Sequence, residues 1–184
     1  MVEEFFGVAL ANDLVARGYA ADLTTANNVL AHVPDINDFV AGFAVLLKPQ
    51  GVATFEFPHL MELMKHTQFD TIYHEHFSYL SLTAVQRIFA ANGLTVFDVE
   101  TLSTHGGSLR VYAQRADVGA HELNARVAQM LTTEEALGMK TPEFYADFQG
   151  RTNRIKNDLM AFLIEAQRAG KTVAAYGAAA KATR

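Results

Sequence analysis

The side chains with the greatest capacity for chemistry gather in residues 69–79, whose sequence is FDTIYHEHFSY. Two imidazoles, a carboxylate and two phenols lie within seven of these residues. Because histidine titrates near neutral pH and neighbouring carboxylates and phenols can tune it, the cluster predicts acid–base chemistry. On a strand, Tyr73 and Glu75 would share one face. His74 and His76 would share the other, whereas a loop would let all four converge. The alternative is a polar surface loop whose histidines have no joint role.

The composition is that of a globular protein with a real core. Half of the 184 residues are hydrophobic and about a fifth are charged, which suits one domain, or one domain and part of a second. A net charge of −5 argues against nucleic-acid binding. The absence of cysteine excludes disulfides and thiolate metal sites within the chain. No apolar run approaches the roughly 20 residues that span a bilayer, and residues 1–4 lack signal-peptide features. We therefore expect a cytoplasmic protein without a membrane partner.

The elements that must position the cluster follow from hydrophobic periodicity and turn signals. Helices are predicted over residues 3–17, 36–48, 83–92, 119–137 and 141–169, and strands over residues 21–26, 51–57, 94–100, 108–115 and 171–176. The strand over 21–26 is expected to be buried, residues 49–51 to form a turn, and Thr83 with Gln86 to form a capping box. This alternation predicts an α/β fold with a parallel sheet, ending in an antiparallel hairpin at its edge.

Polar residues follow two of the predicted strands. Asn27, Asn28 and His32 come after the first strand, and the acid–base cluster lies beyond the second. Ligands bind at the carboxyl ends of parallel strands, so both groups should open onto one crevice. A weaker anion site is expected at residues 177–181, where a single glycine turn opens a helix.

Four ordered stretches carry a family resemblance. They are residues 26–35 (ANNVLAHVPD), 69–79, 105–110 (HGGSLR) and 176–181 (YGAAAK). In this order they resemble the S-adenosylmethionine-dependent C-methyltransferases that act on nucleotide-linked keto-deoxysugars, such as the branched-sugar C-3 methyltransferases. Members of that family have an N-terminal zinc module, a Rossmann-like methyltransferase domain and a C-terminal α/β domain that holds the sugar nucleotide.

The resemblance implies a division of this chain. Residues 1–118 correspond to the second half of the class I methyltransferase domain, 119–169 to a helical connector, and 170–184 to the start of the C-terminal sugar-nucleotide-binding domain. We expect the zinc module and the glycine-rich cofactor loop to be absent from this chain, so zinc would belong only to that module. The expected cofactor is S-adenosylmethionine, and the expected partner is a nucleotide-linked sugar.

The resemblance also implies roles for single residues. Methylation of a carbon beside a ketone needs a base, a group that stabilises the enolate, and a methyl sulfonium. By position in the motif, His76 is the base, Tyr73 and Glu75 orient the substrate or the base, and His32 assists or faces the cofactor. The implied cofactor-binding residues are Ala26, Asn27 and Asn28. The implied substrate-binding residues are His105, Gly106, Gly107, Tyr176 and Lys181.

Other interpretations remain open at this point. The chain could be a non-catalytic sugar-nucleotide-binding or inactive fragment of such an enzyme. A metal site of His74, Glu75 and His76 is disfavoured, because adjacent ligands are hard to bring onto one ion. His74 could only pack, His105 could serve a turn, and Lys181 could be a solvated cation. His59, His66 and His121 are expected at the surface. The edge of the strand over 21–26 could pair with a second copy, giving a homodimer or a domain swap.

Overall fold

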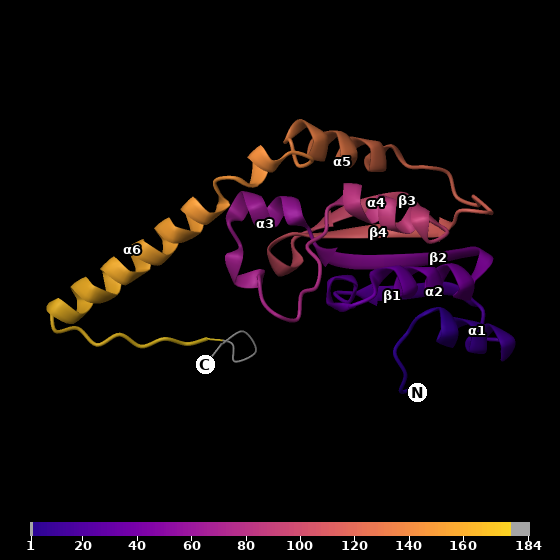
Figure 1. Ribbon diagram of the computed structural model, residues 1–184, viewed down its shortest axis with the longest axis horizontal. Helices are drawn as coiled ribbons and strands as arrows, with labels where there is room; N and C mark the ends of the chain where they lie inside the picture. Colours follow the sequence, from indigo (N-terminus) through magenta and orange to yellow (C-terminus); the bar gives the residue numbers. More distant parts are fainter. Residues whose placement is uncertain (1, 178–184) are drawn as a thin grey trace.

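The computed structural model describes residues 2–177, and one mixed four-stranded sheet forms its centre (Figure 1). The strand order is β1–β2–β4–β3. β1 (Ala21–Asn27) runs parallel to β2 (Leu47–Pro58), and β4 (Ser108–Arg115) lies antiparallel between β2 and β3 (Leu94–Leu102). The predicted α/β class and the antiparallel hairpin are confirmed.

Helices cover one face of this sheet and extend beyond it. They are α1 (Val8–Ala16), α2 (Ile36–Leu46), α3 (Leu60–His66), α4 (Leu82–Ala91), α5 (Ala125–Ala136) and α6 (Phe148–Arg168), with short 3₁₀ turns at Leu30–His32, Phe69–Thr71, Thr104–Gly106 and Pro142–Tyr145. Phe55 of β2 contacts Phe43 of α2 and Phe89 of α4, with ring centroids 4.7 and 4.8 Å apart. Both helices therefore pack on the same face, and these aromatic side chains form the centre of the core.

The period-two pattern of β2 sends alternate side chains to opposite faces of the sheet. Phe55 and Phe57 enter the core, whereas Glu56 lies on the other face opposite Arg110 of β4. Arg110 donates to Glu56 at 2.9 Å, and the Thr104 hydroxyl donates to the same carboxylate at 2.8 Å. Burial raises the pKa of Glu56, but these hydrogen bonds and the Arg110 charge outweigh it and lower the pKa below its usual value. The ionised carboxylate thereby holds the β3–β4 turn against β2.

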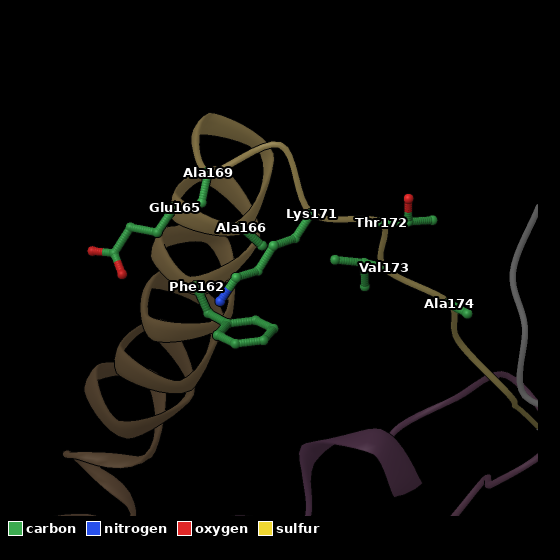
Figure 2. A pocket seen from close by; sticks show the side chains of 8 residues that line it. All are labelled: Phe162, Glu165, Ala166, Ala169, Lys171, Thr172, Val173 and Ala174. Atoms are coloured by element: carbon green, nitrogen blue, oxygen red, sulfur yellow. The ribbon is translucent and has the colours of Figure 1, made fainter.

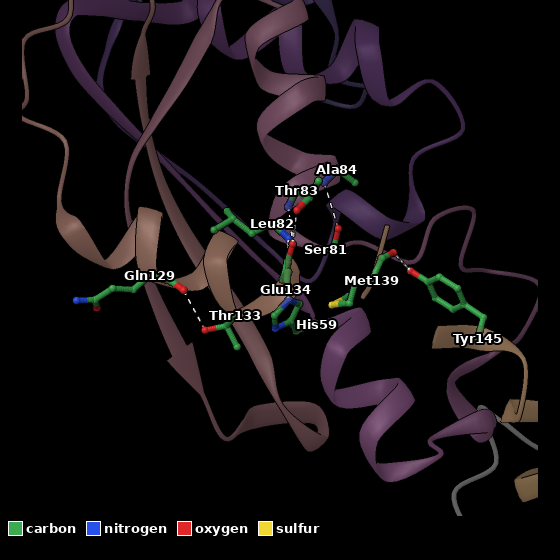
Figure 3. Close-up of polar contacts among 10 residues, drawn as sticks. All are labelled: His59, Ser81, Leu82, Thr83, Ala84, Gln129, Thr133, Glu134, Met139 and Tyr145. Carbon is green, nitrogen blue, oxygen red and sulfur yellow. Dashed lines mark hydrogen bonds and ion pairs between the residues drawn. The ribbon is translucent and has the colours of Figure 1, made fainter. Parts of the chain in front are cut away.

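A buried carboxylate, Glu134 of α5, binds the N-terminus of α4 (Figure 3). It accepts hydrogen bonds from the backbone amides of Leu82 (2.6 Å) and Thr83 (2.8 Å) and from the Thr83 hydroxyl (2.6 Å). The His59 ring also lies 2.7 Å from it through Nε2, which must donate because a carboxylate only accepts. Burial raises the pKa of Glu134, yet the hydrogen bonds from His59, Thr83 and Leu82 lower it below its usual value.

Two predictions about the residues around Glu134 are wrong. His59 is only 1% exposed, so its expected place at the surface is wrong. The capping box of Thr83 and Gln86 is also wrong, because Ser81 is the N-cap and its hydroxyl accepts from the Ala84 amide at 3.1 Å. Thr83 is instead engaged by Glu134, which lies 51 residues away in the sequence. A local pattern cannot show such a partner.

Several predicted boundaries also shift. α1 begins only at Val8, α5 covers Ala125–Ala136, and α6 begins at Phe148 after a separate 3₁₀ turn. The predicted turn over 49–51 lies inside β2, where the register with β1 is irregular between Ala21 and Leu23. Residues 171–176 have no regular secondary structure, so the predicted strand there is wrong, and residues 178–181 of the expected anion turn lie outside the described residues.

β1 forms one edge of the sheet, and this explains its exposure. Only Ala26 of this strand is buried, and Leu23 is 62% exposed, so the expectation of a buried strand is wrong. Within residues 2–177, β1 pairs with β2 alone. Pairing of this edge with a second copy stays a prediction.

α6 extends away from the sheet, at the left of Figure 1. Its apolar residues Ile155, Leu159 and Phe162 are between 44% and 60% exposed, so they do not pack into the core. In the described part of the chain, no helix is long and apolar enough to cross a membrane.

Replacement of Glu134 by Gln should destabilise the fold by about 2–4 kcal/mol, because it removes charge-assisted hydrogen bonds from buried donors. Urea unfolding measures this as a lower midpoint. Glu135→Gln is the matched control, since the carboxylate of the neighbouring Glu135 forms a surface ion pair with Lys140, and such pairs contribute about 0–1 kcal/mol. Equal midpoints for the two variants would show that the buried carboxylate does not hold α4.

The Glu134 carboxylate should also make the free energy of unfolding depend on pH in the acidic range. Its folded-state pKa lies below the ordinary value of 4.5, so its contribution is complete above about pH 4.5 and is lost as the pH falls through the folded-state pKa. Below that pH the free energy of unfolding of the wild type should fall more steeply than that of Glu134→Gln. Urea titrations at successive pH values test this, and parallel curves for the two proteins would contradict it.

Candidate functional site

A cavity of about 370 Å³ opens at the carboxyl ends of β1 and β2. Three segments supply its walls: the ends of the two strands, the connection that follows β2, and the β3–β4 turn. Its lining residues are Asn28, Pro58, Gln68, Asp70, Thr71, Tyr73, His76, His105 and Gly106. The expectation that the strand ends and the acid–base cluster share one crevice is therefore confirmed for Asn28, Tyr73 and His76, whereas Asn27 and His32 do not line the cavity.

His76 is held in a defined tautomer. Its Nδ1 lies 2.8 Å from the carbonyl oxygen of Thr71, and because a carbonyl can only accept, Nδ1 carries the hydrogen. In the neutral ring, Nε2 is then the basic nitrogen. The Tyr73 ring lies tilted against the imidazole with centroids 4.4 Å apart, and the Tyr79 ring lies edge-on at 5.9 Å. Burial raises the pKa of the Tyr79 phenol, so this hydroxyl stays protonated at neutral pH.

His32 lies beside His76, with ring centroids 4.6 Å apart. It belongs to the 3₁₀ turn after β1, and its Nδ1 lies 3.0 Å from the Glu75 carbonyl oxygen. The backbone carbonyl of Ala31 also accepts from the amide of Phe77 at 2.8 Å. These bonds fasten the cluster to the end of β1. Both imidazoles thus have Nδ1 fixed by a backbone carbonyl and the same tautomer when neutral.

The β3–β4 turn closes the opposite side of the cavity. His105 and Gly106 adopt positive φ angles of 53° and 79°. The Gln68 side-chain amide donates to the Gly106 carbonyl at 2.7 Å, and a Cβ at position 106 would lie only 2.5 Å from the Gln68 Nε2. Gly107, by contrast, faces Glu62 of α3 and does not line the cavity.

Not every predicted site residue reaches this cavity. The Glu75 carboxylate is 59% exposed and lies 3.9 Å from His74, so only the backbone of Glu75 takes part. The Ala26 side chain packs in the core, and Asn27 is exposed but does not line the cavity. Tyr176 is fully exposed on the C-terminal segment.

Lys181 lies outside the described residues, so its expected role cannot be placed. Sequence reasoning in turn missed Gln68, whose amide joins two walls of the cavity. It also gave no role to Thr71, whose carbonyl orients the His76 ring. The only signal for either was proximity to the acid–base motif, since backbone acceptors have no signature in a sequence.

Among residues 2–177, no group of three or more His, Asp or Glu side chains is placed to hold a metal ion. A larger cavity of about 650 Å³ lies at the end of α6, between Phe162, Glu165 and Lys171 (Figure 2). None of the predicted site residues that the structure describes lines it.

The sequence matches a known family over just over half of its length. Residues 6–99 match the family described as "Methyltransferase domain". The chain belongs to this methyltransferase family. Residues 103–184 match a second family, described as "C-methyltransferase C-terminal domain". The cavity of this methyltransferase therefore takes walls from both matched segments, because Asn28 and His76 belong to the first and His105 to the second.

The chain is also similar to individual known proteins. The chain is 39% identical over 176 residues to the C-methyltransferase NovU of Streptomyces niveus, covering 96% of this chain. It spans 42% of the length of NovU. Parts of the chain also resemble the solved magnesium protoporphyrin IX methyltransferase of Synechocystis (TM-score 0.39, 16% identity, 51% of this chain and 44% of that chain) and an S-adenosylmethionine-dependent methyltransferase of Clostridium acetobutylicum (TM-score 0.42, 10% identity, 56% and 68%).

Replacement of Gly106 by Ala should destabilise the β3–β4 turn through two effects. A side chain at positive φ costs about 1–2 kcal/mol, and the new Cβ would collide with Gln68. Gly18→Ala is the control, because Gly18 has a similar φ of 85° and no atom within 4 Å of a built Cβ. Urea midpoints should rank wild type above Gly18→Ala and Gly18→Ala above Gly106→Ala. Equal losses in the two variants would mean that the contact with Gln68 is not tight.

Proposed function

We propose that this chain is part of an S-adenosylmethionine-dependent C-methyltransferase that acts on a nucleotide-linked keto sugar. The observation that carries the proposal is the position of His76. Its imidazole lines the cavity, and its Nδ1 donates to the Thr71 carbonyl. The match to a C-methyltransferase C-terminal domain and the likeness to NovU support methylation of carbon. Methylation of carbon beside a ketone is the reaction that needs such a base.

The cavity is compatible with a polar, cationic methyl donor. It lies within the range of about 300–1,000 Å³ that small-molecule sites occupy, and the Asn28 amide and the Asp70 carboxylate line it. The Tyr73 ring adds an aromatic face of the kind that attracts cations. When bound, S-adenosylmethionine supplies an electrophilic methyl group. Asn28, just beyond the carboxyl end of β1, would hold it.

His76 removes the proton. Its Nε2 takes the hydrogen from the carbon beside the substrate ketone, and the electrons of that C–H bond pass into an enolate. The enolate carbon would then form a bond to the methyl group as the bond between sulfur and that methyl group breaks, S-adenosylhomocysteine would leave, and His76 would keep the proton until it passes to solvent. Because Nδ1 stays bonded to Thr71, the ring cannot turn when it becomes charged. The general base contributes typically about 10²–10⁴-fold to the rate.

Neighbouring groups would orient the substrate and stabilise the enolate oxygen. The Tyr73 phenol lies against the base and can donate a hydrogen bond to an oxyanion. His32 is a second imidazole beside His76 and would assist it. At the β3–β4 turn, His105 and the exposed backbone of Gly106 let a sugar nucleotide approach closely. Glu75 would act through its carbonyl, which orients His32.

Replacement of His76 by Asn, in the protein encoded by the complete reading frame, should lower kcat by about a hundred- to ten-thousandfold. Affinity for S-adenosylmethionine, measured by calorimetry, should stay nearly unchanged. His74→Asn is the matched control, because the His74 side chain is 82% exposed and does not line the cavity.

A second readout separates proton removal from methyl transfer. Incubation with the keto-sugar nucleotide in deuterium oxide, without the methyl donor, should exchange the hydrogen beside the ketone in the wild type and in His74→Asn but not in His76→Asn. Normal turnover and exchange by His76→Asn would show that another group is the base. Binding of both ligands by the wild type without exchange or turnover would instead favour the non-catalytic, sugar-nucleotide-binding function.

A further inference from the structure

We propose that Gln68 is a positioning residue that sets the tautomer and the orientation of His76. The inference rests on the proposed role of His76 as the base, and it adds a residue outside the acid–base motif. Gln68 lies eight positions before His76 and just after the left-handed Thr67 that ends α3. Its side chain is half-buried in the cavity wall. We infer that its influence on the imidazole passes through the hydrogen bonds described next.

Four hydrogen bonds, arranged in three consecutive links, connect the β3–β4 turn to the His76 ring. The Gln68 Nε2 donates to the Gly106 carbonyl at 2.7 Å. The main-chain carbonyl of Gln68 accepts two hydrogen bonds from Thr71, one from the backbone amide at 3.1 Å and one from the hydroxyl at 2.8 Å. The Thr71 carbonyl then accepts from the Nδ1 of His76 at 2.8 Å. Each bond fixes the group that makes the next one.

A hydrogen bond to α3 also fixes the backbone of Gln68. Its backbone amide donates to the Leu63 carbonyl of α3 at 3.0 Å. The residue thus joins α3, the β3–β4 turn and the 3₁₀ turn Phe69–Thr71, so its position is determined on three sides. A flexible side chain on a loose loop could not orient Thr71 in this way.

The chemistry of this link requires an amide at position 68 and a glycine at position 106. A glutamate would have no hydrogen to donate and would place a negative charge against the Gly106 carbonyl. Any side chain at position 106 would lie within 2.5 Å of the Gln68 Nε2. The two residues therefore depend on each other, although 38 positions separate them.

The consequence for catalysis follows from the two nitrogens of imidazole. In a neutral imidazole, a hydrogen-bond acceptor beside one ring nitrogen keeps the hydrogen on that nitrogen. If the Thr71 carbonyl turns away, Nδ1 loses its acceptor and the hydrogen can move to Nε2. An Nε2 that already carries hydrogen cannot accept the substrate proton. Gln68 therefore keeps the basic nitrogen of His76 available.

The test replaces the amide by a side chain of similar length without donors, Gln68→Met. Long-range ¹H–¹⁵N correlation spectra of histidine-labelled protein, recorded at a pH where the rings are neutral, identify the tautomer of each histidine. The wild type should show His76 with hydrogen on Nδ1, and Gln68→Met should show a mixture or the other tautomer. Gln149→Met is the matched control, because Gln149 bonds only to Asn153 on the surface of α6 among the described residues.

Kinetics give the second readout. Gln68→Met should lower kcat about ten- to a hundredfold with little change in KM, since misplacement of a catalytic group slows the chemical step more than binding. Thr71→Val, which removes the hydroxyl bond to Gln68, should change the tautomer in the same direction. Thr71→Ser, which keeps the hydroxyl, should restore the wild-type spectrum.

The outcomes are distinguishable from a failure of the proposed function. A wild-type His76 tautomer in folded Gln68→Met or folded Thr71→Val would overturn the positioning role. A changed tautomer in a protein whose wild type neither exchanges nor methylates the substrate would support positioning by Gln68 while rejecting His76 as a base.

Discussion

One buried carboxylate holds both ends of the segment that carries the candidate site. Glu134 binds His59 at the start of the connection between β2 and α4, and it binds Leu82 and Thr83 at its end. The backbone of Leu60 also donates to Leu80 at 2.9 Å, so the ends of the connection lie side by side. The residues between these ends form a closed loop, and the Glu134 side chain of α5 together with this backbone hydrogen bond holds its two ends together.

Closure of the ends does not by itself order the middle of a loop, because fixing each residue costs about 1–2 kcal/mol of backbone entropy. The middle is fastened at two further points. Ala31, after β1, accepts from the amide of Phe77, and Gly106, in the β3–β4 turn, accepts from Gln68. The imidazoles lie between these fastening points. Hydrogen bonds to neighbouring elements thus take the place of the regular structure that residues 72–79 lack.

Patterns that are local in the sequence predicted the local parts of the fold. β3 and β4 and the hairpin between them follow from alternating residues and a glycine turn, and they are confirmed. The convergence of Asn28 and His76 was also predictable, because the carboxyl ends of parallel strands meet at one edge of a sheet. The burial of His59 was not, because its partner lies 75 residues away.

The same distinction explains the errors within the candidate site. Types and spacing of residues identified His32, Tyr73 and His76, whose rings do lie together. They could not show that Glu75 acts through its carbonyl while its carboxylate faces solvent. The sequence states which side chains are present. The direction of a backbone carbonyl depends on turns that are held by residues far away in the sequence. For this reason the orientation of both imidazoles became visible only in the structure.

The sheet also makes one site out of the two matched family segments. β1, β2 and most of β3 belong to the segment over residues 6–99, and β4 belongs to the segment over 103–184. Yet β4 lies between β2 and β3, and Arg110 on β4 binds the carboxylates of Glu56 and Glu100 on its two neighbours. Removal of β4 would leave two separate pieces of sheet and take away the turn that forms one wall of the cavity. The methyltransferase segment therefore depends on the segment that follows it for the shape of its own site.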